Sequence, residues 1–246
     1  MDAMPLLLFG VGALAGVVNV LAAGGSMLTV PLLIFAGLDP TVANGTNRVA
    51  IVLQNLTAVG RFRHVGLTDT ALSTKLALWT LPGGILGAWY GASIDDAALR
   101  LVLAGVLLVT TLTLFLPQRL RTAGGWERGR WLVYPAMLGI GFYGGFIQIG
   151  VGFLLLAALR GLLGVDLVRA NAHKVFVVLV YMLPALLVFW WLGKIDWRLG
   201  LAVGSGNIVG AWVATHLALK GGERWIRVVV AVAAVAMAGK LLAGSL

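Results

Sequence analysis

Long apolar stretches separated by short polar loops run through almost the whole chain. Apolar residues fill 60% of the 246 positions and charged residues only 11%, whereas a typical soluble domain has about 25% charged residues. A membrane β-barrel would need alternating polar and apolar residues, and stretches such as residues 101–109 do not alternate. Because backbone groups in lipid must find their hydrogen bonds within the segment, the sequence predicts an all-α, polytopic membrane protein.

The second half of the chain repeats the first. The matching residues that lie 127 positions apart are Asp39 and Asp166, Ala43 and Ala170, Asn44 and Asn171, Gly66 and Gly193, Asp69 and Asp196, and Arg100 and Arg227. Residues 85–89 match residues 208–212 at a spacing of 123, so small insertions and deletions offset one another. Two related halves in an apolar chain are typical of secondary transporters, whose substrate lies where the halves meet.

The chain divides into two transmembrane repeats, residues 1–117 and 131–246, joined by residues 118–130. The joining segment carries four arginines, and we predict that it is a basic cytoplasmic linker. Helices are expected for the apolar segments of the first repeat, which are residues 5–22, 26–38, 43–61, 72–93 and 98–117. The corresponding segments of the second repeat are residues 131–148, 152–164, 172–192, 197–218 and 226–243.

The second segment of each repeat is too short to cross a membrane. Residues 26–38 and 152–164 are 13 long, about 20 Å as helix, whereas the hydrocarbon core is about 30 Å thick. Small residues precede both segments, and we predict a broken helix or a helical hairpin at each joint. Non-helical backbone at membrane depth survives only inside protein or beside a cavity. The joints are therefore the best indicators of a binding site.

The distribution of lysine and arginine favours inverted repeats. If each opening segment is one long span, the repeats run parallel and the two faces carry nine and seven cations. If each is a hairpin, the repeats are inverted and thirteen cations face the cytoplasm. The outer face then carries four, Arg100, Lys194, Arg198 and Lys240. The positive-inside rule favours the second arrangement, although four-plus-four parallel spans stay open as an alternative.

Polar residues gather where the third segment of each repeat opens. Asn44, Thr46, Asn47 and Arg48 stand there in the first repeat, and Asn171, His173 and Lys174 in the second. Helix N-termini present unpaired N–H groups and a positive dipole end, which predicts an anion site. The alternative is N-capping by the two asparagines, with the cations reaching out to lipid head groups.

Two amides precede the joints at matching positions. Asn19 and Gln148 either form interhelical hydrogen bonds or line the substrate cavity, and Ser26 closes the first joint. Gln54, Asn55 and Asn207 raise the same question from neighbouring segments.

Several other functions are disfavoured. All carboxylates fall in loops or at segment ends, so a buried carboxylate proton relay is not expected; if protons are coupled, His173 or the substrate carries them. The chain has three scattered histidines and no cysteine, so we predict no metal, no cofactor and no catalysis. The net charge of +9 lies mainly in loops, which indicates contact with anionic lipid. No basic-aromatic platform for nucleic acid is present.

A set of glycine-rich and polar motifs extends over nearly the whole chain. They are Gly16-x-x-Asn19-x-x-Ala22-Ala23-Gly24-Gly25, Pro31-Leu32-Leu33, Gly37-Leu38-x-Pro40-x-x-Ala43-x-Gly45-Thr46-Asn47, Gly66-x-x-Asp69, Leu81-Pro82-Gly83, Gly87-Ala88, Gly141-x-x-x-Gly145 and Ala170-Asn171-Ala172-His173-Lys174. Together they resemble the TauE/SafE sulfite exporter family. The sequence departs from it where a third glycine and a serine are common, at Ser26 and Asn47.

The resemblance implies a bacterial inner-membrane permease for small sulfur-containing anions such as sulfite, sulfoacetate or other organosulfonates. It implies a binding region at Gly24, Gly25, Thr46 and Asn47 in one repeat and at Asn171, His173 and Lys174 in the other.

We therefore predict a secondary transporter that works by alternating access between two inverted repeats. Its substrate-binding residues would be Asn19, Gly24, Gly25, Ser26, Asn44, Thr46, Asn47, Arg48, Gln148, Asn171, His173 and Lys174. Arg48, His173 and Lys174 would balance the charge of the anion. An anion channel built from the same residues and a membrane assembly or lipid-binding protein without transport remain alternatives. The oligomeric state is open, with a homodimer as one option.

Overall fold

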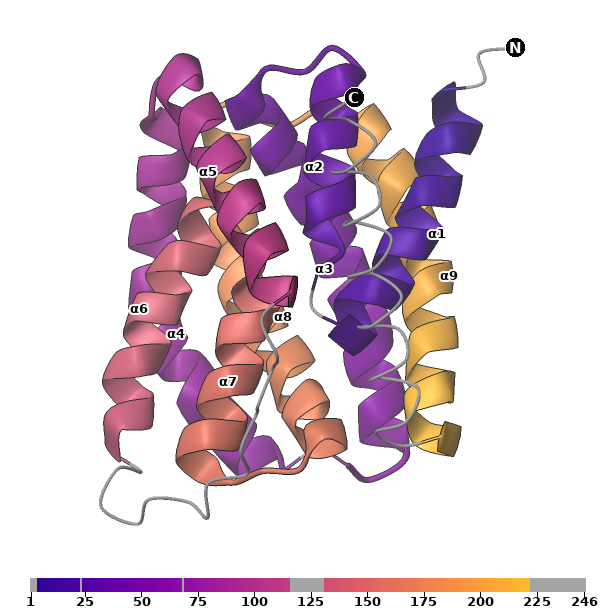
Figure 1. The fold of residues 1–246 in the computed structure, drawn as a ribbon, viewed down its shortest axis with the longest axis vertical. Helices are drawn as coiled ribbons and strands as arrows, with labels where there is room; N and C mark the ends of the chain where they lie inside the picture. Colours follow the sequence, from indigo (N-terminus) through magenta and orange to yellow (C-terminus); the bar gives the residue numbers. More distant parts are fainter. Residues whose placement is uncertain (1–3, 23, 68, 116–130, 222–246) are drawn as a thin grey trace.

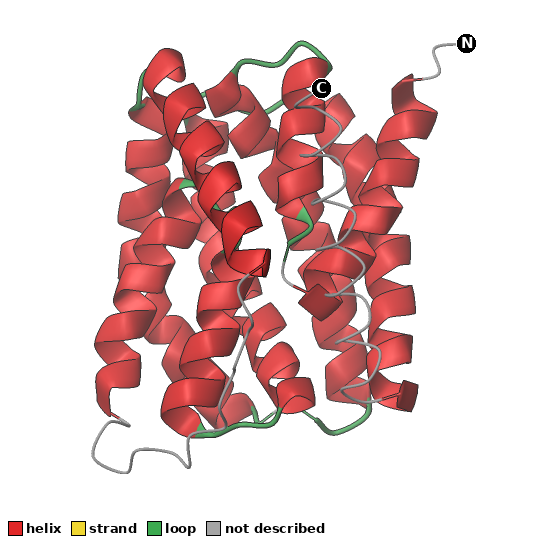
Figure 2. Ribbon diagram, in the orientation of Figure 1, coloured by secondary structure: helices red, strands yellow, loops and turns green. Residues whose placement is uncertain are grey.

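The computed structural model describes residues 4–22, 24–67, 69–115 and 131–221, and this part of the chain consists of helices without a strand (Figures 1 and 2). The all-α prediction is thus confirmed for the described residues. The predicted linker, residues 118–130, lies outside them. So does the last apolar segment, residues 226–243, with Arg227 and Lys240.

Nine helices occupy the described residues. The first repeat contributes α1 (Met4–Ala22), α2 (Ser26–Phe35), α3 (Pro40–His64), α4 (Thr70–Ser93) and α5 (Asp96–Phe115). The second contributes α6 (Val133–Phe146), α7 (Val151–Leu163), α8 (Leu167–Trp191) and α9 (Trp197–Gly221).

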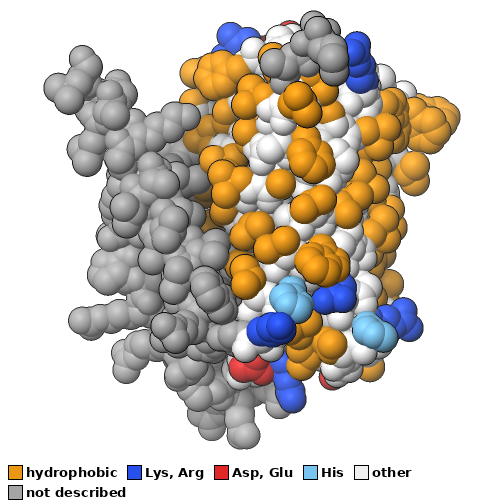
Figure 3. Space-filling view, turned by 90° about the vertical axis from the view of Figure 1, so that its right-hand side faces the viewer, with side chains coloured by type: hydrophobic (Ala, Val, Ile, Leu, Met, Phe, Trp, Pro, Cys, Tyr) orange, Lys and Arg blue, Asp and Glu red, His pale blue; other side chains and the backbone are white. Residues whose placement is uncertain are grey.

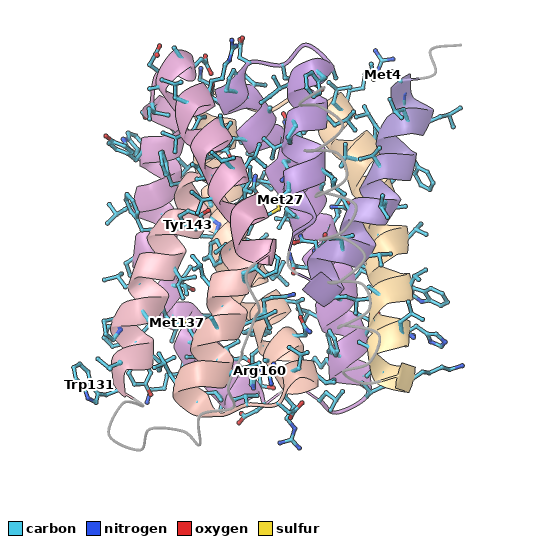
Figure 4. The ribbon with its side chains drawn as sticks, viewed as in Figure 1. Met4, Met27, Trp131, Met137, Tyr143 and Arg160 are labelled. Atoms are coloured by element: carbon cyan, nitrogen blue, oxygen red, sulfur yellow. The ribbon has the colours of Figure 1, made fainter. Side chains whose placement is uncertain are left out.

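The opening segment of each repeat is a helical hairpin that turns back inside the molecule. The chain reverses between α1 and α2, and again between α6 and α7. Figure 4 places Met27, at the start of α2, and Tyr143, near the end of α6, at mid-height. The helices α2 and α7, of 10 and 13 residues, then lead back to opposite ends of the molecule (Figure 1). The predicted interruption of both opening segments is confirmed, in its hairpin form.

The central helices α3 and α8 begin earlier than their polar clusters suggested. Helix α3 has its N-cap at Asp39 and proline at its first position, where the missing N–H costs nothing. The side chain of Asp166 caps α8 by accepting from the N–H groups of Val168 and Arg169, both at 3.0 Å. The predictions that Asn44 and Asn171 stand at a helix N-terminus, or cap one, are therefore wrong, because both lie more than a turn inside.

Glycines let two pairs of helices pack backbone against backbone. A Cβ on Gly16 of α1 would lie 2.7 Å from the carbonyl oxygen of Asn207 in α9. The equivalent atom on Gly145 of α6 would lie 2.1 Å from the carbonyl oxygen of Gly84 in α4. Small residues at such crossings replace the hydrophobic drive that lipid does not supply.

These contacts recur with the spacing of the sequence repeat. Gly16 and Gly145 are 129 residues apart, as are Asn19 and Gln148, while Gly84 and Asn207 are 123 apart. A second matching contact joins Gly12 to Val203 and Gly141 to Thr80, with a Cβ on each glycine lying 2.3 and 2.2 Å from the facing carbonyl oxygen. Each repeat thus packs its first helix on the fourth helix of the other repeat, α1 on α9 and α6 on α4.

The two hairpins enter from opposite ends. Figure 4 shows Met4, at the start of α1, at the top and Trp131, just before α6, at the bottom. The side chain of Arg48 meets both Phe189 and Met182, while Gly45 also packs on Phe189, so α3 and α8 run antiparallel. Opposite directions for equivalent helices support an inverted repeat, which stays a prediction.

The surface suits a bilayer. Three helices, Met4–Leu21, Leu167–Trp191 and Trp197–Lys220, are long and apolar enough to cross a membrane by length and composition. Figure 3 shows a hydrophobic band across the middle of one face, with Lys and Arg side chains towards its ends. The end where α3 meets α4 carries Arg61, Arg63, Lys75, Arg160, Arg169 and Lys220, and the opposite end carries Arg100, Lys194 and Arg198. The positive-inside rule predicts that the first of these ends is cytoplasmic.

Candidate functional site

A small cavity of about 20 Å³ lies where the two hairpin tips meet α3 and α8. Its lining residues are Asn19, Ser26, Ile51, Gln54, Asn55, Gln148, Val151, Gly152, Lys174, Val178 and Met182. Both repeats contribute to it, and the volume is enough for about one water molecule.

The returning helix of each hairpin starts at this cavity. Ser26 is the first residue of α2 and Val151 the first of α7, and both line the cavity. Helix N-termini carry the positive end of the helix dipole. Their first N–H groups are largely bonded here, since those of Met27 and Leu28 donate to the carbonyl oxygens of Gly24 and Gly25. The helix termini that face the central space are therefore those of α2 and α7, and not those of α3 and α8 as the sequence suggested.

Lys174 is the only charged residue among those that line the cavity. Its side chain is 3% exposed, and its ammonium group donates to the carbonyl oxygens of Asn19 at 3.0 Å and Val20 at 2.8 Å. These carbonyls belong to the last turn of α1, where a cation is favoured by the helix dipole. An ammonium group has three donors, so one remains for a ligand.

Three amides, of which Gln54 and Asn207 are buried and Asn19 is half-buried, connect α1, α3 and α9 beside the ammonium group. The Oε1 atom of Gln54 accepts from Nδ2 of Asn19 at 3.1 Å and from Nδ2 of Asn207 at 3.3 Å. Asn19 therefore bridges helices and also lines the cavity, while its contact with a substrate stays a prediction. The carbonyl of Gln54 is occupied, which leaves its Nε2 group to a ligand.

Gln148 forms the turn between α6 and α7. It is the one residue other than glycine with a positive φ, 60°, in the described part of the chain, and such a conformation is uncommon for a side chain of this size. Its Nε2 group donates to the backbone oxygen of Asn44 at 2.9 Å and to Oδ1 of Asn44 at 3.3 Å. Its Oε1 atom is buried and has no hydrogen-bond partner among the described residues.

Arg48 holds the end of α6 and does not line the cavity. Its guanidinium group donates to the carbonyl oxygens of Gly145, of Gly144 at 3.5 Å and of Phe146 at 3.4 Å. It also lies 4.2 Å above the ring of Phe189. Arg48 and Lys174 thus act alike, because each binds carbonyls that end the first helix of the other repeat. The structure gives Arg48 a positioning role in place of the direct ligand contact that we predicted.

The other predicted polar residues of α3, Asn44, Thr46 and Asn47, are not among those that line the cavity and bind other segments of the chain. Asn44 donates to the carbonyl oxygen of Phe146 at 2.8 Å, and Thr46 accepts from the N–H of Asp196 at 2.9 Å. Asn47 accepts from Thr29 at 2.6 Å and donates to Ser26 at 3.4 Å.

Gly24 and Gly25 allow the first hairpin to turn tightly. A Cβ on Gly25 would lie 2.2 Å from the carbonyl oxygen of Ala15, so a larger residue would push the hairpin open. A Cβ on Gly24 would touch the Phe153 ring of the other hairpin at 3.6 Å. Neither glycine is among the residues that line the cavity.

A larger pocket of about 610 Å³ opens at the end where α3 meets α4 and α7 meets α8. It reaches His173, whose Nδ1 atom lies 2.7 Å from the hydroxyl of Ser73. The predicted charge-balancing neighbours His173 and Lys174 therefore face different spaces, the open pocket and the central cavity. Asn171 lies in the second turn of α8 and is fully buried. Neither of its amide atoms has a hydrogen-bond partner among the described residues.

The sequence prediction missed part of the lining. Gln54 and Asn55 were recognised as unusual but not included among the binding residues, although both face the cavity. The apolar wall formed by Ile51, Val178 and Met182 carried no signal, because such residues are ordinary in a membrane helix.

Arg48 offers a test of its positioning role. Arg48→Met should lower the melting temperature of the purified protein, because three buried carbonyls at the end of α6 would lose their donor at about 1–3 kcal/mol for each unsatisfied group. The exposed Arg100→Met is the matched control and should melt like the wild type. A variant that melts normally but no longer binds anions would instead show a direct ligand contact.

Comparisons with known proteins agree with this architecture. The family model described as sulfite exporter TauE/SafE matches residues 8–241. A probable membrane transporter protein of Haemophilus influenzae is 29% identical over 241 residues, covering 96% of this chain and 93% of the relative. The probable membrane transporter protein YfcA of Escherichia coli K12 is 30% identical over 246 residues, covering 97% and 90%. YjnA of Bacillus subtilis, also a probable membrane transporter protein, is 26% identical over 241 residues, covering 90% and 91%. No solved structure matches the chain.

Proposed function

Since the chain belongs to the TauE/SafE sulfite exporter family and is a membrane transporter of the bacterial inner membrane, we propose that it carries small sulfur-containing anions through its central cavity. The substrates would be sulfite, sulfoacetate or other organosulfonates. The observation that supports this most directly is the meeting of two helix N-termini and one buried ammonium group at a single cavity.

The chemistry of the lining favours an anion. Lys174 supplies one positive charge, and no carboxylate is among the lining residues. Gln54, Asn55 and Ser26 add neutral hydrogen-bonding groups, and α2 and α7 point the positive ends of their dipoles at the same space. Such donors in a water-poor site stabilise an oxyanion better than they would in water.

The proposed mechanism is alternating access. The central cavity measures about 20 Å³, whereas the pocket at the predicted cytoplasmic end measures about 610 Å³. Along α8, Lys174 lines the central cavity and its neighbour His173 lines the larger pocket. A rocking of the repeats that widens the passage between these residues would expose the site to one side of the membrane at a time.

Binding to the purified protein tests the proposal. Calorimetry in detergent or nanodiscs should detect binding of sulfite or a sulfonate, with carboxylates of equal size as the comparison. In proteoliposomes, saturable flux that is stimulated by substrate on the opposite side would support a carrier. Unitary conductance would instead indicate a channel, and the absence of both binding and flux would favour a protein without transport.

Filling the cavity should abolish binding without unfolding the protein. Val178 lines the cavity from α8, and Val178→Phe would occupy the space that a ligand needs. The control is Leu187→Phe on the same helix, at a site that is 56% exposed towards lipid. Calorimetry should show lost binding for the first variant and normal binding for the second. Melting curves should show both variants folded, with the first lowered by an overpacking cost of about 1–3 kcal/mol. Equal binding by both would place the site elsewhere.

A further inference from the structure

The carbonyl oxygen of the Gln148 side chain is the one feature of the cavity that an anion alone does not explain. The residue is 3% exposed and lines the cavity, and its Oε1 atom has no hydrogen-bond partner among the described residues. A buried acceptor without a donor is costly, and native structures rarely keep one without a reason. A bare oxyanion offers only acceptors, so it would leave this atom unsatisfied.

The orientation of this amide is fixed by its neighbours. The nitrogen side of the amide faces the backbone oxygen of Asn44 at 2.9 Å. A backbone carbonyl only accepts hydrogen bonds, so exchanging the nitrogen and oxygen of Gln148 would set two acceptors against each other. The network therefore assigns Oε1, and not Nε2, to the unpartnered position.

The turn that carries Gln148 also prevents the side chain from finding another partner easily. The positive φ of 60° sets its direction, and the hydroxyl of Tyr143 donates to the carbonyl oxygen of Ile149 at 2.6 Å across the same turn. Backbone strain held in place by its surroundings is often found at ligand sites. The acceptor is thus held ready at the tip of the second hairpin.

The equivalent position in the first hairpin differs. Asn19 uses its Nδ2 group on Gln54 and its backbone oxygen on Lys174. The cavity therefore has unequal sides, with the remaining donor of Lys174 on one and the free acceptor of Gln148 on the other. A ligand that satisfies both must have an anionic oxygen and also a hydrogen-bond donor.

We propose that the preferred ligand of this cavity is an oxyanion that carries its own O–H or N–H group, which donates to Gln148 while the anionic oxygens bind Lys174. This inference rests on the proposed function, because it names the class of anion that the same site would take. A site built to bind a substrate hydroxyl or amine strongly rejects an analogue that lacks it, since its own polar group is then left unpaired.

Two sulfonates of nearly equal size test the inference. Isethionate has a hydroxyl group where 1-propanesulfonate has a methyl group, and both carry one sulfonate charge. Calorimetry on the purified wild-type protein should show roughly ten- to hundredfold tighter binding of isethionate, which corresponds to one buried acceptor left unsatisfied. Equal binding of the two, as expected if a water molecule satisfies Gln148, would overturn the inference and leave the proposed function standing.

Two variants locate the discrimination. Gln148→Met keeps the length of the side chain and removes the acceptor, so the preference for isethionate should fall to about onefold. Thr57→Val is the control, because the hydroxyl of Thr57 donates to the carbonyl oxygen of Leu53 in its own helix at 3.0 Å and the residue is not among those that line the cavity; it should retain the preference. Retained preference in Gln148→Met would overturn the role of Gln148. If the wild type bound neither sulfonate, nor sulfite, the proposed function itself would fail.

Discussion

Gly87→Leu should prevent the protein from folding into a stable monodisperse form. Gly87 lies in α4 where it crosses α6, and a Cβ there would lie 2.0 Å from the carbonyl oxygen of Phe142. The obstructing atom belongs to the backbone of a helix and has no rotamer to change. Overpacking a core costs about 1–3 kcal/mol even where side chains yield, so this substitution should cost more. Size-exclusion profiles and melting curves after membrane extraction would measure the loss.

The repeat supplies a second copy of this experiment. Gly210 lies 123 residues after Gly87, and a Cβ on it would lie 2.1 Å from the carbonyl oxygen of Ala13 in α1. Gly210→Leu should therefore destabilise the folded protein to the same degree. The controls are Gly105→Leu and Gly139→Leu, because a Cβ at either position meets nothing within 4 Å. If all four variants behaved alike, the close packing of α4 on α6 and of α1 on α9 would be wrong.

Lys174→Met should reduce anion binding by roughly ten- to hundredfold. The substitution removes the only charge among the residues that line the cavity, and a hydrogen bond to a charged group contributes about 1.5–3 kcal/mol. Calorimetry with a sulfonate would measure the change in Kd. Transport assays in proteoliposomes should show a parallel loss at low substrate concentration.

The same substitution also affects the fold, so controls are needed. Lys174 donates to the carbonyl oxygens of Asn19 and Val20, and their loss should lower the melting temperature as well. Lys174→Arg keeps a cation that can hold these carbonyls, so it should melt closer to the wild type. Lys220→Met removes an exposed cation at the end of α9 and should change neither property. Normal affinity in a folded Lys174→Met protein would exclude the ammonium group from the site.

The sequence predicted the helical class and the interrupted openings because each depends on local rules. Residues 26–38 are too short to span a bilayer, whatever surrounds them, and the structure has a hairpin there. The repeat spacing also pointed to Asn19 and Gln148, which meet at one cavity. Lys174, singled out by its place in the second repeat, lies beside them.

The roles of Arg48 and Thr46 could not be read from the sequence, because they depend on which groups other helices bring near. Arg48 and Lys174 look equivalent in a linear pattern, yet one meets three carbonyls of α6 and the other keeps a donor for the cavity. The helix boundary mattered as well. A cap at Asp39, and not at Asn44, moved the polar cluster from the end of α3 to its interior, where its side chains bind other helices.

The bonds from Lys174 to the end of α1 have one more consequence. The ammonium group that would bind an incoming anion is the same group that links the first hairpin to α8 of the opposite repeat. A bound anion would take the third donor of this group and share its positive charge with the two carbonyls, so occupying the proposed site should weaken the link between the hairpin and the opposite repeat. In the empty protein both hydrogen bonds keep their full strength, so the first hairpin should be held most firmly when no anion is bound.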